Sequence, residues 1–535
     1  MTDLTRRRLI RGAGGALTLA ALGACSRSSG PTELTAANGF VEPTDPRVTD
    51  LEATRRRPGQ RTVTAQLNAR QVGLDLGGVT VQTWAYGDDV PGPIIRATAG
   101  DLVTVQVTNN LPTGTSVHWH GIRLRNDMDG VPGLTQSPIG VGASFTYSFT
   151  APDPGTYWYH PHSGVQVDRA LHGALIIDDP AEPGDYDVEW VVLMDDWVDG
   201  TGRTPDEILA RLRASGGADA TNDGAGGMGG MNGMGGMSGG AGTPSSAPSP
   251  TLSPSAGSAA GPSPTGMGGM GGMGMGGGSI MYPYYLVNGR LPTAPVTFSA
   301  KPGQRARIRL INAGADTAFR VALGGHRMTV THTDGFAVTP VEADALVMGM
   351  GERYDVLVTL KDGVFPLAVV PEGKPGHARA LVRTAAGEAP DAAVRPAELK
   401  GYVLLGPAIL PAESSMLPRR GPNRLLKMVL EGSMNPYRWT INGQRHPHVE
   451  PFPVEAGERV RFKIMNRSPM FHPWHIHGHT FALAESGLRK DTVILRPMQV
   501  MYLELQADNP GLWMNHCHNL YHAESGMMST LAYKR

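Results

Sequence analysis

Cysteine, net charge and helical periodicity are all scarce in this sequence, and each shortage excludes a class of protein. Among 535 residues there are two cysteines, Cys25 and Cys517, which are too few for a disulfide framework. The formal net charge is −1, so we expect neither a basic surface that binds nucleic acid nor a solvating acidic tail. Patterns with a helical period are rare, and residues 205–214 form one short candidate helix. The chain therefore depends on strands and turns.

Glycine and proline, in contrast, are abundant, with 71 and 43 residues. The length suits about three domains, and a hydrophobic fraction of 40% permits sizeable cores. One pattern occurs three times, at residues 100–109, 303–312 and 457–466. Each copy begins with a turn glycine, alternates apolar and polar residues, and ends at asparagine. Such alternation is typical of a strand with one buried face.

A second element is repeated upstream of each of these strands. It reads Tyr-Gly at residues 86–87, Leu-Val-Asn-Gly at residues 286–289 and Thr-Ile-Asn-Gly at residues 440–443. Self-similarity at so wide a spacing indicates duplicated domains rather than a solenoid, and many short strands between glycine and proline turns indicate β-sandwiches. We predict an all-β fold with three related sandwich domains. Their predicted bounds are 59–181, 182–398 and 399–535.

The N-terminus has the composition of an export signal. Arginines at residues 6–8 precede a short stretch of small and apolar residues, 12–24, and this order of a basic and an apolar region is typical of secreted proteins. The apolar stretch is too short to span a bilayer in the mature protein. The paired arginines followed by Leu-Ile resemble a twin-arginine signal, a route that exports folded proteins.

The signal ends in a motif that resembles a lipoprotein cleavage box, Leu-Gly-Ala-Cys at residues 22–25. Lipidation of Cys25 would anchor the protein to a membrane, and cleavage near Ala24 with a soluble product is the alternative. Residues 26–58 are rich in Ser, Pro and Arg and are interpreted as a tether. We expect an exported, lipid-anchored protein of the cell envelope, in the periplasm or on the outer face of the membrane.

Residues 216–279 interrupt the second domain with Gly, Met, Ser, Pro and Ala and show no core pattern, which predicts a disordered insert. A plain flexible linker is one interpretation. The other is Cu(I) capture, because thioethers are soft ligands that select Cu(I) and exposed methionine is otherwise a liability to oxidation. The candidate ligands are Met228, Met231, Met234, Met237, Met267, Met270, Met273 and Met275.

Histidines gather in four short segments, at residues 118–121, 159–162, 472–479 and 516–527, and each segment contains a His-x-His pair. On a strand such a pair points both rings to one side, which suits a metal cluster held between domains. In the last segment Cys517 would point away from its two histidine neighbours. One thiolate and two imidazoles would then serve two metal sites and connect them for electrons.

These four segments closely resemble the motifs of the multicopper oxidases, and the resemblance covers residues 59–535. It implies three cupredoxin-like Greek-key β-sandwich domains and four copper ions, one of type 1, one of type 2 and two of type 3. The resemblance assigns His472, Cys517 and His522 to type 1 copper, with Met527 as the axial ligand. It assigns His118 and His475 to type 2 copper. It assigns His120, His160, His162, His477, His516 and His518 to the type 3 pair.

The resemblance also implies a reaction. A substrate would give single electrons to the type 1 copper through the exposed edge of His472 or His522. Cys517 would pass them to His516 and His518, and the trinuclear cluster would reduce O₂ to two waters.

Protons must also reach the cluster. Asp129 resembles a family acid that delivers protons, although a turn residue before Gly130 is an equal interpretation. Position 523 is alanine where several bacterial relatives carry an acid, so Glu524 or another group would have to substitute for that acid.

Three functions remain open from the sequence. The first is an exported cuprous oxidase for copper tolerance, the second a laccase-like oxidase of phenols or aromatic amines, and the third a copper-binding buffer protein. A complete trinuclear set argues against the third, because storage needs no O₂ site. The methionine tract and the possible lipid anchor favour the first. A monomer is the simplest expectation, because one chain supplies all three domains.

Overall fold

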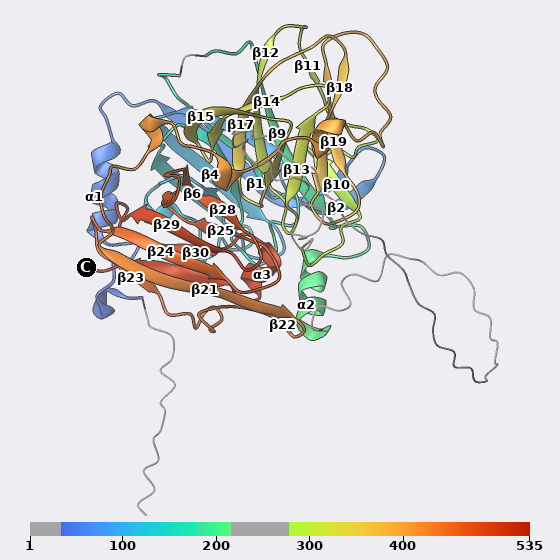
Figure 1. Cartoon of the computed structure of the whole chain (residues 1–535). Coiled ribbons are helices and arrows are strands. Elements are labelled where there is room, and N and C mark those ends of the chain that lie inside the picture. The colour runs from blue at the N-terminus through green and yellow to red at the C-terminus, as the bar shows by residue number, and fades with distance from the viewer. Residues whose placement is uncertain (1–33, 183, 216–277) are drawn as a thin grey trace, which may run out of the picture.

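The computed structural model describes residues 34–182, 184–215 and 278–535 (Figure 1). The predicted signal with Cys25, residues 26–33 of the tether, and residues 216–277 with all eight candidate methionines lie outside the described residues. The described chain folds into six sheets, two for each of three domains, so the prediction of an all-β fold is confirmed. In Figure 1 the second domain lies above the third.

The first domain is a sandwich of two four-stranded sheets, in the orders β2-β1-β4-β6 and β3-β8-β7-β5. Its strands are β1 (Thr62–Asp75), β2 (Thr80–Tyr86), β3 (Gly92–Thr98), β4 (Leu102–Asn110), β5 (His118–His120), β6 (Ser144–Thr150), β7 (Gly155–His160) and β8 (Gly173–Asp178). Apolar residues of the first sheet, among them Val103, Val105 and Val107, pack against Leu175 and Ile177 of the second. The histidine strand β5 lies at one edge of the second sheet.

The second domain consists of two six-stranded sheets, in the orders β10-β9-β12-β17-β14-β15 and β11-β19-β18-β13-β16-β20. Its strands are β9 (Val188–Trp197), β10 (Tyr284–Val287), β11 (Thr297–Ser299), β12 (Arg305–Asn312), β13 (Phe319–Leu323), β14 (Met328–Thr333), β15 (Phe336–Ala343), β16 (Ala345–Met348), β17 (Arg353–Thr359), β18 (Val364–Pro371), β19 (Ala378–Arg383) and β20 (Val403–Leu405).

The third domain has a six-stranded sheet, β22-β21-β24-β29-β26-β27, and a five-stranded sheet, β23-β31-β30-β25-β28. Its strands are β21 (Arg424–Met434), β22 (Tyr437–Ile441), β23 (Phe452–Val454), β24 (Arg459–Asn466), β25 (His472–Ile476), β26 (Phe481–Leu483), β27 (Arg489–Lys490), β28 (Thr492–Leu495), β29 (Val500–Gln506), β30 (Leu512–Cys517) and β31 (Met528–Tyr533). The two histidine-bearing strands, β25 and β30, are central neighbours in the second of these sheets.

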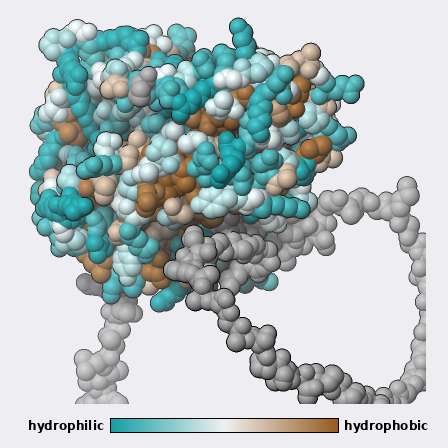
Figure 2. Space-filling view, turned by 45° about the horizontal axis from the view of Figure 1, so that its top comes forward, coloured by the Kyte–Doolittle hydropathy of each residue, from teal (hydrophilic) through white to brown (hydrophobic). Residues whose placement is uncertain are grey.

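The helices are short. They are α1 (Pro46–Arg55), α2 (Pro205–Ser215) and α3 (Leu520–Glu524), with 3-10 turns at Ala36–Asn38, Asn126–Met128, Ala397–Lys400, Gly406–Ala408 and Glu413–Ser415. The helix predicted at residues 205–214 is α2. Within the described residues, no helix has the length and apolar character to cross a membrane. The face in Figure 2 is largely hydrophilic, with scattered hydrophobic patches.

The three repeated strands are β4, β12 and β24, and they occupy the same place in each domain. Each pairs in parallel with the first strand of its domain. The terminal asparagine has a common function, because each amide donates to a carbonyl of a loop. The acceptors, each in the loop that follows the repeated strand, are Thr113 for Asn109, Thr317 for Asn312 and Met470 for Asn466, at 2.9, 3.0 and 2.7 Å. The repeat thus ends by fastening a loop to the sheet end.

The prediction of a tether over residues 26–58 was wrong for the described residues 34–58. Val41 donates its backbone N–H to the carbonyl of Tyr533 at 2.8 Å, and α1 packs on the first domain. The buried Glu52 accepts from the N–H and the hydroxyl of Thr150, both at 2.8 Å. A few buried contacts of apolar and acidic residues thus hold residues 34–58 against the fold, although their composition is that of a linker.

Two predicted boundaries also differ. The third domain was expected to begin at residue 399, but Val403 pairs with Ala345 in parallel, so β20 belongs to the second domain. The insert was expected to extend to residue 279, but Ser279 is 1% exposed and hydrogen-bonded within the fold. Contacts with distant segments set both limits, strand pairing for Val403 and hydrogen bonding for Ser279. Such contacts cannot be predicted from local composition.

Candidate metal centres

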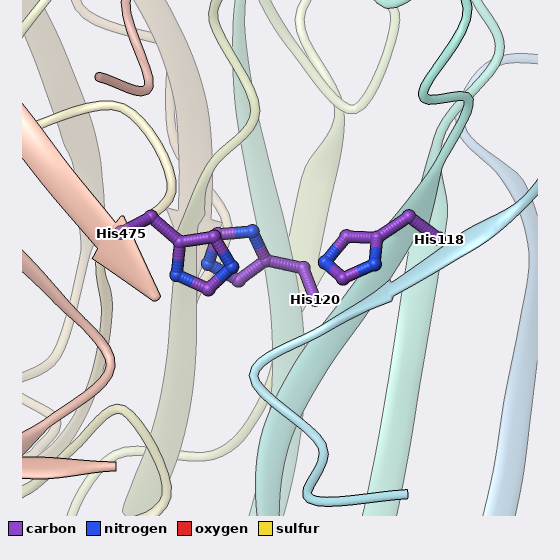
Figure 3. Close-up of side chains that lie close together, drawn as sticks. All are labelled: His118, His120 and His475. Carbon is purple, nitrogen blue, oxygen red and sulfur yellow. The ribbon is translucent and has the colours of Figure 1, made fainter. Parts of the chain in front are cut away.

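Histidines from the first and third domains meet in three groups, in which every ring is buried except that of the half-buried His162. Two strand pairings bring them there: β5 with β7, which places His118 opposite His160, and β25 with β30, which places His475 opposite His516. The groups are His118, His120 and His475; His120, His160 and His518; and His162, His477 and His516, each with its ligand atoms within 4.8 Å of one another. Figure 3 shows the first group, with rings converging from two domains.

A fourth group contains Cys517, His472 and His522. Cys517 Sγ lies 3.4 Å from His472 Nδ1 and 3.9 Å from His522 Nδ1, and the two Nδ1 atoms are 3.2 Å apart. Alternation along β30 predicts this separation, because Cys517 faces one group while His516 faces another. Met527, the predicted axial residue, is fully buried in the same core cluster as Cys517.

The ring nitrogens show whether metal fits the histidine groups. Six buried nitrogens of these histidines have no hydrogen-bond partner: His118 Nε2, His120 Nδ1, His160 Nε2, His475 Nε2 and both ring nitrogens of His518. Buried polar atoms without partners are rare in folded proteins. The opposite Nδ1 of His118, His160 and His475 donates to a backbone carbonyl at 2.8–2.9 Å, which leaves Nε2 with a free lone pair, as in metal-ligating histidines. The residues present fit the predicted copper cluster.

The protonation states agree with this fit. Burial, followed by repulsion from neighbouring imidazoles, lowers the pKa of His120, His160 and His475 well below the usual value, so these rings are neutral and able to bind metal. Burial raises the pKa of the Cys517 thiol, so a metal ion must displace a proton there. Two imidazoles and one thiolate suit copper, with the thiolate as the soft ligand.

The expectation of an exposed edge on His472 or His522 was wrong, because both are fully buried. Ser468 Oγ lies 2.7 Å from His472 Nε2, and Ser279 Oγ lies 3.2 Å from His522 Nε2. The Trp439 ring covers His522 with 3.9 Å between centroids. Electrons from a donor must therefore cross at least one intervening side chain.

Asp129 is fully buried between two predicted ligands. Its Oδ2 lies 2.9 Å from His477 Nδ1, its Oδ1 lies 3.2 Å from His118 Nδ1, and burial raises its pKa. The carboxylate is thus placed to orient both rings, and proton delivery by Asp129 stays a prediction. Glu524 lines the same cavity as His162 and His516, so it also remains a candidate acid.

Sequence reasoning missed the residues that support the ligands from outside. They are Ser279, Arg353, Ser468, Asp491 and Thr492. Two of them carry a weak local signal, since Ser468 precedes the third histidine segment by four residues and Ser279 ends the methionine tract. The others lie in segments without histidine motifs.

Comparison with known proteins agrees with the fold and the sites. Profiles of the multicopper oxidases match residues 69–182, 189–386 and 419–535. The chain is 46% identical to multicopper oxidase MmcO of Mycobacterium tuberculosis (strain ATCC 25618 / H37Rv), over 98% of this chain and 96% of that protein. It is 27% identical to copper resistance protein A of Escherichia coli, over 87% and 93%. Its fold is similar to Fet3p, a multicopper oxidase that functions in iron import, with a TM-score of 0.70, 20% identity and coverage of 88% and 90%.

Three cupredoxin-like sandwiches that enclose histidine and cysteine groups define a copper-dependent oxidoreductase. The chain belongs to the multicopper oxidase family. Its cofactors are copper ions of types 1, 2 and 3, which supply one-electron transfer and the reduction of O₂ when bound. The protein holds their ligands in place, buries them and supplies the hydrogen bonds that orient them.

Proposed function

We propose that this oxidase takes electrons from Cu(I) and thereby confers copper tolerance. The observation that carries the proposal is the group of side chains that separates His522 from the protein surface. Ser279 Oγ lies between His522 Nε2 at 3.2 Å, the Tyr437 hydroxyl at 3.0 Å and the thioether sulfur of Met434 at 3.8 Å. One hydroxyl therefore separates a soft Cu(I) ligand from a predicted type 1 histidine. The E. coli relative named for copper resistance supports the same assignment.

The position of Ser279 connects the methionine tract to this entry point. Met275, the last methionine of the tract, precedes Ser279 by four residues in the sequence. Asp316 holds the segment in place, since its carboxylate accepts from the N–H groups of Ser279 and Ile280, both at 3.0 Å. Cu(I) gathered by the tract would be released next to His522.

The burial of His472 and His522 favours a small donor over a bulky one. Met434 is partly exposed, whereas the imidazole of His522 behind it is fully buried. A phenol would have to donate across the same cover without a thioether contact. Oxidation of phenols is the second candidate function, and parallel assays with both donors separate the two.

Met434→Leu tests the entry site, because leucine keeps the volume and removes the sulfur. We expect the KM for Cu(I) to rise about tenfold, equivalent to about 1.4 kcal/mol of binding, with phenol oxidation unchanged. Oxygen uptake with each donor measures both. The matched control is Met498→Leu, since Met498 is 70% exposed in the turn before β29. An unchanged KM for Cu(I) in Met434→Leu would exclude this entry site.

Replacing the eight tract methionines by serine, at constant length, tests collection of Cu(I). We expect a larger loss of kcat/KM for Cu(I) than for the phenol, because serine cannot bind Cu(I) through sulfur. Ser279 is retained because it contacts His522. Equal losses for both donors would show that the tract is a linker.

We also propose that the protein is exported by the twin-arginine route, anchored through lipid on Cys25, and monomeric. The arginine pair and the Leu-Gly-Ala-Cys motif support export and anchoring. Anchoring would hold the enzyme where copper crosses the membrane. The mass of the mature N-terminal peptide decides between lipidated Cys25 and cleavage near Ala24, and sedimentation of the delipidated protein decides the oligomeric state.

A further inference from the structure

The second domain contributes no predicted copper ligand, yet one of its loops lies against the histidine groups. This loop, residues 349–352, follows β16 and leads into β17. A Cβ atom on Gly351 would lie 2.9 Å from His120 Cε1 and 3.1 Å from His518 Cδ2. The loop backbone therefore packs directly on two imidazoles, and a side chain at this glycine would displace them.

Arg353, the first residue of β17 after this loop, contacts all three domains. It is fully buried, and its two terminal nitrogens donate to both carboxylate oxygens of Asp491, in the third domain, at 2.7 and 2.6 Å. Its Nε donates to the carbonyl of Thr156, in the first domain, at 3.0 Å. Its Nη1 also donates to the carbonyl of Gly351 at 3.0 Å. A bidentate guanidinium fixes the plane of a carboxylate as well as its position.

Asp491 and its neighbour Thr492 in turn contact two histidines of different domains, His120 and His475. Thr492 Oγ1 donates to Asp491 Oδ1 at 2.8 Å and lies 2.9 Å from His120 Nε2 and 3.0 Å from His475 Nδ1. The carbonyl of Asp491 accepts from His475 Nδ1 at 2.9 Å. The two rings stack with 3.8 Å between centroids and 12° between planes (Figure 3). One hydroxyl thus lies against the outer nitrogens of both stacked rings.

The remaining charged groups of this network hold its backbone. Asp334 accepts from the N–H of Arg353 at 2.9 Å and from the N–H groups of Asp491 and Thr492, both at 3.2 Å. Lys490 Nζ lies 3.1 Å from Asp334 and 3.3 Å from Glu352. Two cations therefore face three carboxylates, all buried. Such a network is costly unless every partner is in place, which favours one rigid arrangement.

The first domain makes room for the same ion pair. Gly121 follows His120 and has φ +89°, a value that disfavours other residues. A Cβ atom there would lie 2.5 Å from Arg353 Nη2 and 2.7 Å from Asp491 Oδ2. The glycine of the first histidine segment is therefore required by a contact with the second and third domains.

We propose that Arg353 is a positioning residue of the oxidase. Through Asp491 and Thr492 it fixes the rings of His120 and His475, so the second domain sets the geometry of the predicted trinuclear site without supplying a ligand. The inference does not depend on whether the donor is Cu(I) or a phenol, because the network touches neither Ser279 nor His522.

Thr492→Val is the sharpest test, since valine keeps the shape and removes the hydroxyl. We expect an altered type 2 EPR signal and a kcat for O₂ reduction lower by about 10- to 100-fold, the range for lost outer-shell hydrogen bonds. The blue absorption should stay unchanged. Thr150→Val is the matched control, because Thr150 is buried and donates to a carboxylate, that of Glu52, outside this network. We expect wild-type EPR and kcat in the control.

Arg353→Lys tests the second-domain link, because lysine keeps the charge and loses the bidentate geometry. We expect the same change in the type 2 EPR signal as in Thr492→Val. The kcat of the double variant should be no lower than that of the more strongly affected single variant, because the two residues act as one unit. Wild-type EPR and kcat in Thr492→Val would overturn the proposal. So would fully additive effects in the double variant, or loss of blue absorption together with the type 2 signal, which would indicate general misfolding.

Discussion

Cys517→Ser is expected to abolish the blue absorption and to reduce turnover about a thousandfold or more, equivalent to about 4 kcal/mol. The thiolate is the single soft anionic ligand in the group with His472 and His522, and the serine oxygen is a poor substitute. The same residue lies between His516 and His518 in the chain, so the substitution removes the thiolate sulfur at which the shortest covalent path between the groups begins. Serine is close to cysteine in size, so the fold should persist.

Visible absorption, oxygen uptake and copper content measure the effect of this substitution together. We expect copper to remain in the three histidine groups, whose ligand atoms do not include Cys517. Cys25→Ser, in the predicted leader, is the control and should leave the enzyme blue and active. A blue, active Cys517→Ser enzyme would show that the type 1 assignment is wrong, and loss of all copper would show that the groups are not independent.

Removal of copper is expected to lower the melting temperature strongly as well as to abolish activity. Without metal, six buried ring nitrogens of the predicted ligands have no partner, and each unpartnered buried polar group costs about 1–3 kcal/mol. Copper that binds the folded state alone stabilises it by about 4 kcal/mol at a thousandfold excess over Kd. The histidine groups join the first and third domains, so their contact should loosen first.

Calorimetry of the copper-loaded and copper-free enzyme at pH 7.5 measures this difference. Burial holds the pKa of His516 at about 4, so protonation of the folded groups does not complicate the comparison at this pH. Readdition of copper should restore the melting temperature, and a Cys517→Ser enzyme should lose only part of the stabilisation. Identical melting temperatures with and without copper would show that the groups do not bind the metal tightly.

Some features of the metal sites follow from local sequence. Alternation along a strand separates Cys517 from His516, and this depends only on the two-residue period of extended backbone. The three repeats likewise predicted β4, β12 and β24, because one-sided burial leaves an alternating pattern. The pattern is weakest in β12, where the face away from the core packs on the first domain and Arg309 is buried against Thr156.

Other features could not be read in this way. Residues 34–58 resemble a linker in composition, yet Val41 and Glu52 bind strands of two domains. The cover of His522 comes from Ser279, which is 243 positions away in the sequence. Arg353 lies in a domain without a histidine motif, and its contact with Asp491 spans 138 positions. A local sequence pattern does not indicate which distant residue will pack against a given side chain.

The sequence by itself determined the chemistry of this protein: the ligand types, their spacing on strands, the number of domains and the family. Only the tertiary structure decided which histidines share a group, that the type 1 histidines are buried beneath Ser279 and Trp439, and that the second domain holds the trinuclear geometry through Arg353. The physical reason is the distance along the chain over which each property is determined. Ligand identity and strand period are properties of a few adjacent residues, whereas burial and orientation depend on contacts between segments that folding alone brings together.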